Sequence, residues 1–340
     1  MGRSDANRRR ELVGAPMDVL VAGAGEYVTG LVGGTASTSD KSIGVVGICL
    51  FHLRARGKVE RILLAGRDGA RFPGIRRHFA RHIASIYRNL DVEVETWPED
   101  GRYRETAYGK ALASLALGSA VIVVTPDDTH FSIALAALKA GMHVLVAKPL
   151  LKTLSEHRAL LETARTRGRL LMQEVHKRFD PIYADARDRA RRLGDCSLMN
   201  SYMSQPKKQL ETFRAWAGRS SDISYYLNSH HIDFHVWIMR GRGRPLTVTA
   251  MGADGVAKGA LDIATEDTIT LSVQWENLPS RNRGEWASTP PPGSRPNRMS
   301  IPSSVFSIWG IGERFRWIRR IEAIPWPAMR RDCIASTRFS

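Results

Sequence analysis

The chain has 340 residues, which is enough for two domains with a sizeable core. Hydrophobic residues make up 43% and charged residues 25%, which excludes a wholly disordered or fibrous chain. No apolar run approaches the roughly 18 residues of a membrane span. No hydrophobic stretch follows the basic N-terminus, and three widely spaced cysteines are typical of a reducing compartment. The sequence therefore predicts a cytoplasmic location and no membrane partner.

The formal net charge of +16 does not indicate a nucleic-acid partner. Basic residues are scattered, whereas a nucleic-acid binder concentrates them on one element. The segment 279–340 contributes eleven arginines, no lysine and four acidic residues. We expect no nucleic acid among the partners.

Short apolar runs alternate with helical patterns through the first half of the chain. The runs are 17–22, 59–65, 92–96, 120–125, 143–147 and 169–174, and the helical patterns are 43–56, 72–88, 106–117, 129–140 and 154–167. This order predicts an α/β fold with a doubly wound parallel sheet. We expect a disordered tail over 1–15 and a dinucleotide-binding Rossmann domain over 16–150.

The pattern changes after residue 180. A helical stretch at 182–192 and alternating strands at 197–203 and 268–275 surround a histidine-rich helical segment, 222–239. This predicts a truncated substrate-binding, catalytic α+β domain over 151–278, with an incomplete and mainly antiparallel sheet. The segment 279–340 holds half of the prolines and half of the tryptophans and keeps no clean period. It is expected to be irregular.

Gly23 and Gly25 follow the first apolar run directly, as in turns that hold a pyrophosphate. The third glycine position of that motif holds Val28, and the helix is expected to begin well after the turn. Glu26 and Tyr27, which follow the turn, are further candidate cofactor contacts.

The residue after the second strand distinguishes the two nicotinamide cofactors. Gly66 and then Arg67 stand there in place of an acid. An arginine accepts a 2′-phosphate, so NADP(H) is favoured and NAD(H) is the alternative. A plain surface role for Arg67 also fits the sequence.

The segment 120–150 carries the clearest chemical signal. Thr125 and Pro126 close one strand, His130 begins the next helix, and Lys148 with Pro149 closes the following strand. A lysine there can donate to a substrate oxygen beside a nicotinamide ring. A cis peptide bond before Pro149 would fix the turn.

These motifs resemble the glucose–fructose oxidoreductase/inositol dehydrogenase (Gfo/Idh/MocA) family of NAD(P)-dependent sugar oxidoreductases. The resemblance extends to the segment 175–181 and covers about 16–278. It implies cofactor contacts from Gly23, Gly25, Glu26, Tyr27, Arg67, Thr125, Pro126, His130, Lys148 and Pro149. The family triplet Glu-Lys-Pro has Ala147 in place of its acid.

The family also carries an Asp-x-x-x-His pair on a helix, with the histidine as proton shuttle. Alignment on Ile232 and Asp233 places His230 at the histidine and Tyr226 at the acid. The resemblance thus implies catalysis by Lys148 and His230, and substrate contacts from Lys148, Arg178, Tyr226, His230 and Asp233. His231 and His235 are expected to be core or surface residues, so no metal site is predicted.

Further similarity to a fungal branch with D-galacturonate reductases implies a sugar or sugar-acid substrate. Charge for its carboxylate could come from Arg178, Lys177 or Lys207.

The resemblance stops near Leu278. A one-base shift of the codon frame over Thr289–Ile324 gives a segment similar to the missing strands, so we expect a frameshifted tail. Such a chain would be poorly stable and inactive, its sheet edge exposed after Trp275 and the family-type homodimer doubtful.

Two other classes remain open. A non-catalytic dinucleotide-binding protein or pseudoenzyme fits Tyr226 and Ala147, and would bind cofactor without sugar-dependent turnover. A structural or interaction module would show no nucleotide-induced shift in melting temperature.

Overall fold

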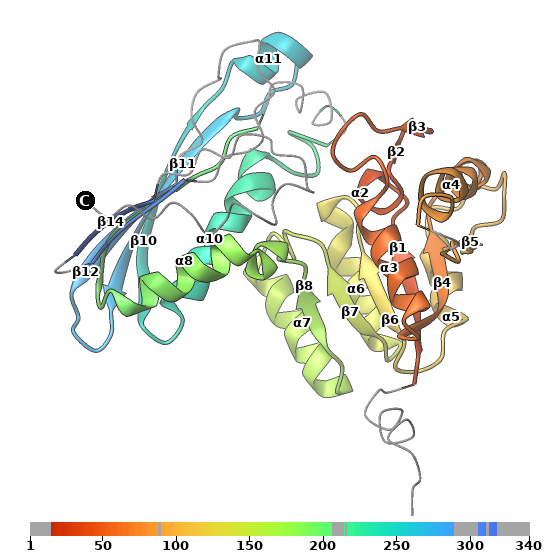
Figure 1. The fold of residues 1–340 in the computed structure, drawn as a ribbon, viewed down its shortest axis with the longest axis horizontal. Coiled ribbons are helices and arrows are strands. Elements are labelled where there is room, and N and C mark those ends of the chain that lie inside the picture. The colour runs from red at the N-terminus through yellow and green to blue at the C-terminus, as the bar shows by residue number, and fades with distance from the viewer. Residues whose placement is uncertain are drawn as a thin grey trace, which may run out of the picture. The chain divides into compact units, whose positions relative to one another are not determined.

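The computed structural model describes residues 15–87, 90–205, 214, 216–288, 305–310 and 313–317. The chain divides into two compact units, one ending at Glu174 and the other beginning at Val175 (Figure 1). The first unit therefore runs past residue 150, where the sequence placed the end of the dinucleotide-binding domain. The difference arises because α7 (Leu154–Arg167) and β8 (Leu171–Gln173) complete its sheet.

The first unit contains a six-stranded parallel sheet, which confirms the predicted doubly wound α/β fold. Its strand order is β5-β4-β1-β6-β7-β8. The remaining bounds are β1 (Met17–Ala22), β4 (Val59–Ala65), β5 (Glu95–Trp97), β6 (Ala120–Val123) and β7 (His143–Val146). The chain runs outward from β1 to one edge and then returns to run outward from β6. Ligands of such sheets bind beyond the carboxyl ends of the strands, at this reversal.

Helices cover both faces of this sheet (Figure 1). One layer holds α2 (Glu26–Thr29), α3 (Val45–Ala55) and α4 (Phe72–Phe79), and the other holds α5 (Ala107–Ala113), α6 (His130–Lys139) and α7. Side chains of a strand alternate between faces. Val19 and Val21 accordingly pack with the first layer, while Leu20 and Ala22 pack with the second. All four are buried, which explains why residues 19–22 are apolar on both faces of the strand instead of alternating between apolar and polar.

The second unit contains a six-stranded, mainly antiparallel sheet, as predicted. Its order is β10-β11-β12-β9-β13-β14, and β12 with β9 is the parallel pair. The bounds are β9 (Cys196–Tyr202), β10 (Gly243–Ala253), β11 (Thr268–Asn277), β12 (Arg283–Ser288), β13 (Val305–Gly310) and β14 (Glu313–Trp317). Helices α8 (Pro181–Arg192) and α10 (Ser229–Met239) bury Tyr183 and Phe234 against Val273 and Trp275 of β11, and α11 spans Val256–Leu261.

The described part of 279–340 differs from the expected irregular structure, because β12, β13 and β14 all fall within it. The expected exposed edge after Trp275 is also wrong, since β12 pairs with β11 from Leu271 to Glu276. The rest of that segment and the N-terminal 1–14 lie outside the described residues. Strand β10 escaped prediction because its alternating run is short and lies between Pro245 and Gly252.

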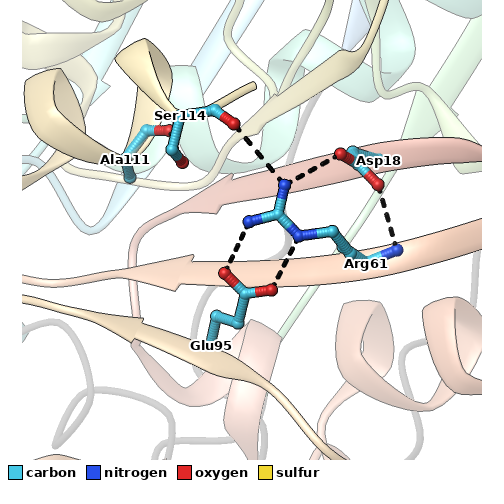
Figure 2. A network of polar contacts seen from close by, with 5 residues as sticks. All are labelled: Asp18, Arg61, Glu95, Ala111 and Ser114. Carbon is cyan, nitrogen blue, oxygen red and sulfur yellow. Dashed lines mark hydrogen bonds and ion pairs between the residues drawn. The ribbon is translucent and has the colours of Figure 1, made fainter. Parts of the chain in front are cut away.

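A brace of charged residues joins three strands of the first sheet near their amino ends (Figure 2). The Arg61 guanidinium donates twice to Glu95, at 2.7 Å each, and once to Asp18 at 3.1 Å. The hydrogen bonds from Arg61 hold the pKa of the Glu95 carboxyl below its usual range. Since these side chains are partly exposed, each such pair contributes about 0.2–1 kcal/mol. The brace lies at the end of the strands away from the glycine turn and is structural.

Candidate active site

Three neighbouring strands of the first unit end in the segments that the sequence singled out. Strand β1 leads into Gly23–Gly25, β6 into Thr125–Pro126, and β7 into Lys148–Pro149. Because β1, β6 and β7 are adjacent and parallel, these three segments meet at one edge of the sheet. This is the carboxyl edge, where an open α/β sheet binds its ligand.

Glycine occupies the two positions of the turn for different physical reasons. Gly23 has φ +115°, and a Cβ built on it would lie 1.9 Å from the carbonyl oxygen of Val124. The fold itself therefore requires glycine there. Gly25 has an ordinary φ of −84°, and a Cβ built on it meets nothing within 4 Å. The fold therefore does not require glycine at position 25, whereas a pyrophosphate that approaches the backbone closely would require it.

The first helix begins closer to the glycine turn than the sequence predicted. Helix α2 starts at Glu26, directly after the turn, and spans four residues before Gly30, which has φ +79°. The hairpin of β2 (Leu31–Val32) and β3 (Thr35–Ala36) then separates it from the longer α3. A Cβ on Gly44 would lie 2.4 Å from the Val28 carbonyl oxygen, so this glycine lets α3 approach α2. Gly30 ends α2 in the left-handed conformation, which glycine adopts readily.

Glu26 and Tyr27 both lie on α2, beside the turn. The Glu26 carboxylate accepts hydrogen bonds from the hydroxyls of Ser37 and Ser39, the latter at 2.7 Å. Glu26 thereby holds the loop after β3 next to the glycine turn. Tyr27 is half-buried.

Arg67 lies just beyond β4, as predicted, and its side chain is 64% exposed. Its guanidinium donates to Glu105 at 3.2 Å. The structure adds a second cation that the sequence did not single out. The Arg71 guanidinium donates to the carbonyl oxygen of Ala24, inside the glycine turn, at 3.3 Å. Arg71 lies four positions after Arg67, but only the structure shows that it reaches the turn.

His130 is buried between the ends of two strands. Its Nδ1 lies 2.9 Å from the Pro149 carbonyl oxygen, and its Nε2 lies 2.9 Å from the Thr125 carbonyl oxygen. Both ring nitrogens therefore face backbone groups of this unit. The ring ties the end of β6 to the Lys148–Pro149 turn, so His130 positions this edge of the sheet.

Lys148 is half-buried at the end of β7, and its peptide bond to Pro149 is cis. Burial lowers the pKa of its ammonium group to about 8. The nearby carboxylates of Asp127 and Glu174 oppose this change, and the ammonium of Lys41 adds to it. A lysine with such a pKa can hold or release a proton near neutral pH. The sequence did not identify these three neighbours.

In the second unit, His230 occupies the first turn of α10 and is 7% exposed. It follows a π-helical turn over Ser224–Asn228, a feature frequent at functional sites. Tyr226, in this turn, packs its ring against Trp216 at 5.2 Å between centroids. The ring of His176 lies 4.9 Å from that of His230. Sequence analysis missed His176, because 54 positions separate the two histidines along the chain.

Arg178 and Asp233 were both predicted to contact substrate, and the structure pairs them with each other. The guanidinium donates to both carboxylate oxygens, at 2.8 Å and 2.6 Å. This hydrogen bonding raises the pKa of Arg178. The neighbouring Lys177 has its pKa lowered by burial and lies 4.9 Å from the centre of the Tyr183 ring. Lys207 lies outside the described residues.

His231 and His235 are core residues of the second unit, 1% and 0% exposed. Burial lowers the pKa of His231 to about 4 and that of His235 well below its usual value. Within the described ranges, no three His, Cys, Asp or Glu side chains gather as a metal site would require. In the same part of the chain, no helix is long and apolar enough to cross a membrane.

Residues 42–175 match the model of the GFO/IDH/MocA oxidoreductase family, which has an NAD-binding Rossmann fold. This agrees with the resemblance found in the sequence. The uncharacterized oxidoreductase YdgJ of Escherichia coli is 33% identical over 132 residues, 38% of this chain and 37% of that protein. The scyllo-inositol 2-dehydrogenase (NAD(+)) of Bacillus subtilis is 40% identical over 70 residues, 21% and 20% of the two chains. The chain thus spans well under half the length of these relatives.

Solved structures extend the likeness to both units. The myo-inositol 2-dehydrogenase of Lactobacillus plantarum superposes with a TM-score of 0.63 over 89% of this chain and 76% of that one. The sequence identity is 17%, so this likeness shows the fold alone. The fold is that of a Rossmann-type unit followed by an antiparallel-sheet unit.

Proposed function

We propose that the protein is an NAD(P)-dependent oxidoreductase that acts on a hydroxyl or carbonyl group of a sugar or sugar acid. One observation carries the proposal. The open space over Gly25 and the pKa-shifted Lys148 lie at the same carboxyl edge of β1, β6 and β7. The family match over 42–175 supports it, as do relatives whose names include inositol and UDP-N-acetylglucosamine dehydrogenases.

The glycine turn would hold the pyrophosphate of the dinucleotide, with Thr125, Pro126 and Pro149 close to the nicotinamide end. Bound cofactor supplies or accepts a hydride at its nicotinamide ring. Arg67 and Arg71 favour NADP(H), because guanidinium groups bind a 2′-phosphate well. NAD(H) is the alternative, since Arg67 has Glu105 as a partner within reach.

The family resemblance gives Lys148, in the first unit, the role of hydrogen-bond donor to the substrate oxygen, and gives His230, in the second unit, the role of proton shuttle. A uronate such as D-galacturonate is the substrate class that we favour. Its carboxylate would find positive charge at Lys177, beside the Arg178–Asp233 pair. The cysteine usage supports a cytoplasmic location, and the match to an oxidoreductase family supports a small-molecule partner.

We also infer that the codons after Ser288 are in a shifted frame. The abrupt arginine- and proline-rich composition supports this inference, as does the family-like segment that codon degeneracy allows a one-base shift to encode. Strand β12 ends at Ser288, so the part of the chain before the shift includes a complete strand. Activity of the chain with this tail is then expected to be low.

The assignment of Lys148 is tested by Lys148→Met. With D-galacturonate and NADPH, we expect kcat/KM to fall about 10²-fold or more, because an oriented donor to the developing oxyanion is lost. Lys139→Met is the matched control, since Lys139 is an exposed lysine of α6 in the same unit.

Each variant is measured with the present tail and with the frame-restored tail. Unchanged turnover in Lys148→Met would reject the role of Lys148. Cofactor binding without turnover in either tail background would identify a non-catalytic dinucleotide-binding protein instead.

A further inference from the structure

The segment just beyond β4 is bound to a second loop of the first unit, which follows β5. The Arg104 amide donates to the Arg67 carbonyl oxygen at 2.8 Å, and the Gly69 amide donates to that of Arg102 at 2.7 Å. A Cβ built on Gly69 would lie 2.1 Å from the carbonyl oxygen of Glu99, so glycine lets the two segments approach. These backbone contacts fix the second loop beside the end of β4.

The Glu105 carboxylate, at the end of this loop, is held by two side chains. One oxygen accepts a hydrogen bond from the Arg67 guanidinium at 3.2 Å, and the other accepts one from the Tyr103 hydroxyl at 2.8 Å. The hydrogen bonds from Tyr103 and Arg67 hold the pKa of Glu105 below its usual range, so the carboxylate is ionised at neutral pH. The Arg67 and Glu105 side chains are 64% and 67% exposed, so a ligand in solution can reach both.

The other charged side chains near the end of β4 have different partners. Asp68 accepts a hydrogen bond from the Ala70 amide at 3.0 Å and thereby caps the 3₁₀ turn that follows it. Arg71 donates to the carbonyl oxygen of Ala24 at 3.3 Å. Arg67, in contrast, holds an anionic group.

The end of β4 lies against the glycine turn, because a Cβ built on Gly66 would lie 3.2 Å from the Cβ of Ala24. The 2′-phosphate of a dinucleotide held at this turn would meet the Arg67 guanidinium, which Glu105 already engages. Resting on the proposed function, we propose that Glu105 is a specificity-determining residue that competes with the 2′-phosphate of NADP(H) for Arg67. NAD(H) lacks that phosphate and would leave the ion pair intact. Glu105 thus reduces the preference for NADP(H) over NAD(H).

Two effects of charge make up this competition. The phosphate must replace the carboxylate on the guanidinium, and it then lies near the carboxylate that it displaced. Exposed ion pairs are weak and solvent screens the repulsion, so the combined effect on affinity is several-fold. A glutamine at position 105 is neutral and nearly the same size, so Glu105→Gln removes the competing charge while the backbone contacts of the loop remain.

Calorimetric titration of the full chain with NADP⁺ and with NAD⁺ tests the proposal. In Glu105→Gln, we expect the affinity for NADP⁺ to rise about three- to ten-fold and that for NAD⁺ to stay within about two-fold of wild type. Glu60→Gln is the matched control, because it removes the same charge from an exposed glutamate of β4. It should change neither affinity by more than about two-fold. An unchanged ratio of the two affinities in Glu105→Gln would overturn the proposal.

A double-mutant cycle shows whether Glu105 acts through Arg67. Arg67→Gln should weaken NADP⁺ binding about ten-fold, and adding Glu105→Gln to it should change that affinity by less than about two-fold. An equal gain from Glu105→Gln in both backgrounds would contradict the competition. A wild-type chain that binds neither dinucleotide would overturn both this proposal and the proposed function. Binding without sugar-dependent turnover would remove only the proposed function, and the affinity ratios would still decide the role of Glu105.

Discussion

At the residue scale, Lys148 makes the site sensitive to pH. Burial lowers its pKa from 10.5 to about 8. The ammonium form, which donates to the substrate oxygen in the proposed function, is therefore lost as the pH rises through about 8. We expect kcat/KM for reduction to fall about ten-fold per pH unit above that value. A pH–rate profile of wild type and Lys148→Met measures it.

Stability should change in the opposite direction over the same range. The folded pKa of Lys148 lies below the unfolded value, so the unfolded chain binds more protons between about pH 8 and 10.5. This group therefore makes the free energy of unfolding rise with pH in that window. A fall in activity above pH 8 without a fall in stability would separate deprotonation of Lys148 from unfolding. A profile that stays flat to pH 10 would contradict the assignment.

The sequence predicted the position of Lys148 just after a strand but not the charged groups around it, for a physical reason. Its own position follows from a strand end and the next proline, which are local features. Asp127 and Glu174 reach it from other strand ends, and Lys41 from a loop, so their proximity depends on strand order. His176 near His230 is a similar case. Contacts of this kind become visible only once the sheet is assembled.

At the element scale, the β1–α2 turn allows a matched pair of substitutions. Gly23→Ala should destabilise the chain by about 2–4 kcal/mol, because its Cβ would overlap the Val124 carbonyl oxygen at a positive φ. Gly25→Ala should change the free energy of unfolding by less than about 0.5 kcal/mol, because its Cβ meets open space. It should still weaken dinucleotide binding about ten-fold or more, since the Cβ would occupy the space proposed for the pyrophosphate.

Denaturant unfolding and calorimetric titration with NADP⁺ and NAD⁺ measure the two effects. The two variants separate the effect of a glycine substitution on stability from its effect on dinucleotide affinity. Full affinity in Gly25→Ala would show that the open space is not the dinucleotide site. The same titrations on wild type decide between the two cofactors, with tighter binding of NADP⁺ expected.

Elements with strong periodicity were predicted closely, including β1, β4 and α7, whose bounds match the expected ranges. Both faces of the first sheet are covered, so β1 and β4 each end in an apolar run, 19–22 and 62–65. In the second unit β10 is exposed along most of its length, so its sequence lacks the pattern of buried apolar residues by which strands are predicted. Helix α2 is too short to produce a helical period at all.

At the scale of the whole molecule, the two units draw their strands from different parts of the chain. All strands of the parallel sheet lie before residue 175, and so do the ion pairs of Arg61 that join three of them. The antiparallel sheet draws strands from both sides of Ser288, since β9 pairs with β12 and with β13. A change in the codon frame after Ser288 would therefore act on the second unit and leave the first sheet intact.

Restoring the frame after Ser288 should stabilise the protein. The present segment 279–340 contains half of the chain's prolines, which cannot donate to a strand ladder, and an excess of arginine charge. We expect a chain with the frame-restored tail to melt about 4–8 °C higher, corresponding to about 2 kcal/mol. Scanning calorimetry should place the gain in the transition of the second unit. A tail with the present residues in shuffled order is the control and should show no gain. A melting temperature that stays equal or falls on restoring the frame would contradict the frameshift, because the restored strands would then fail to pair with β9.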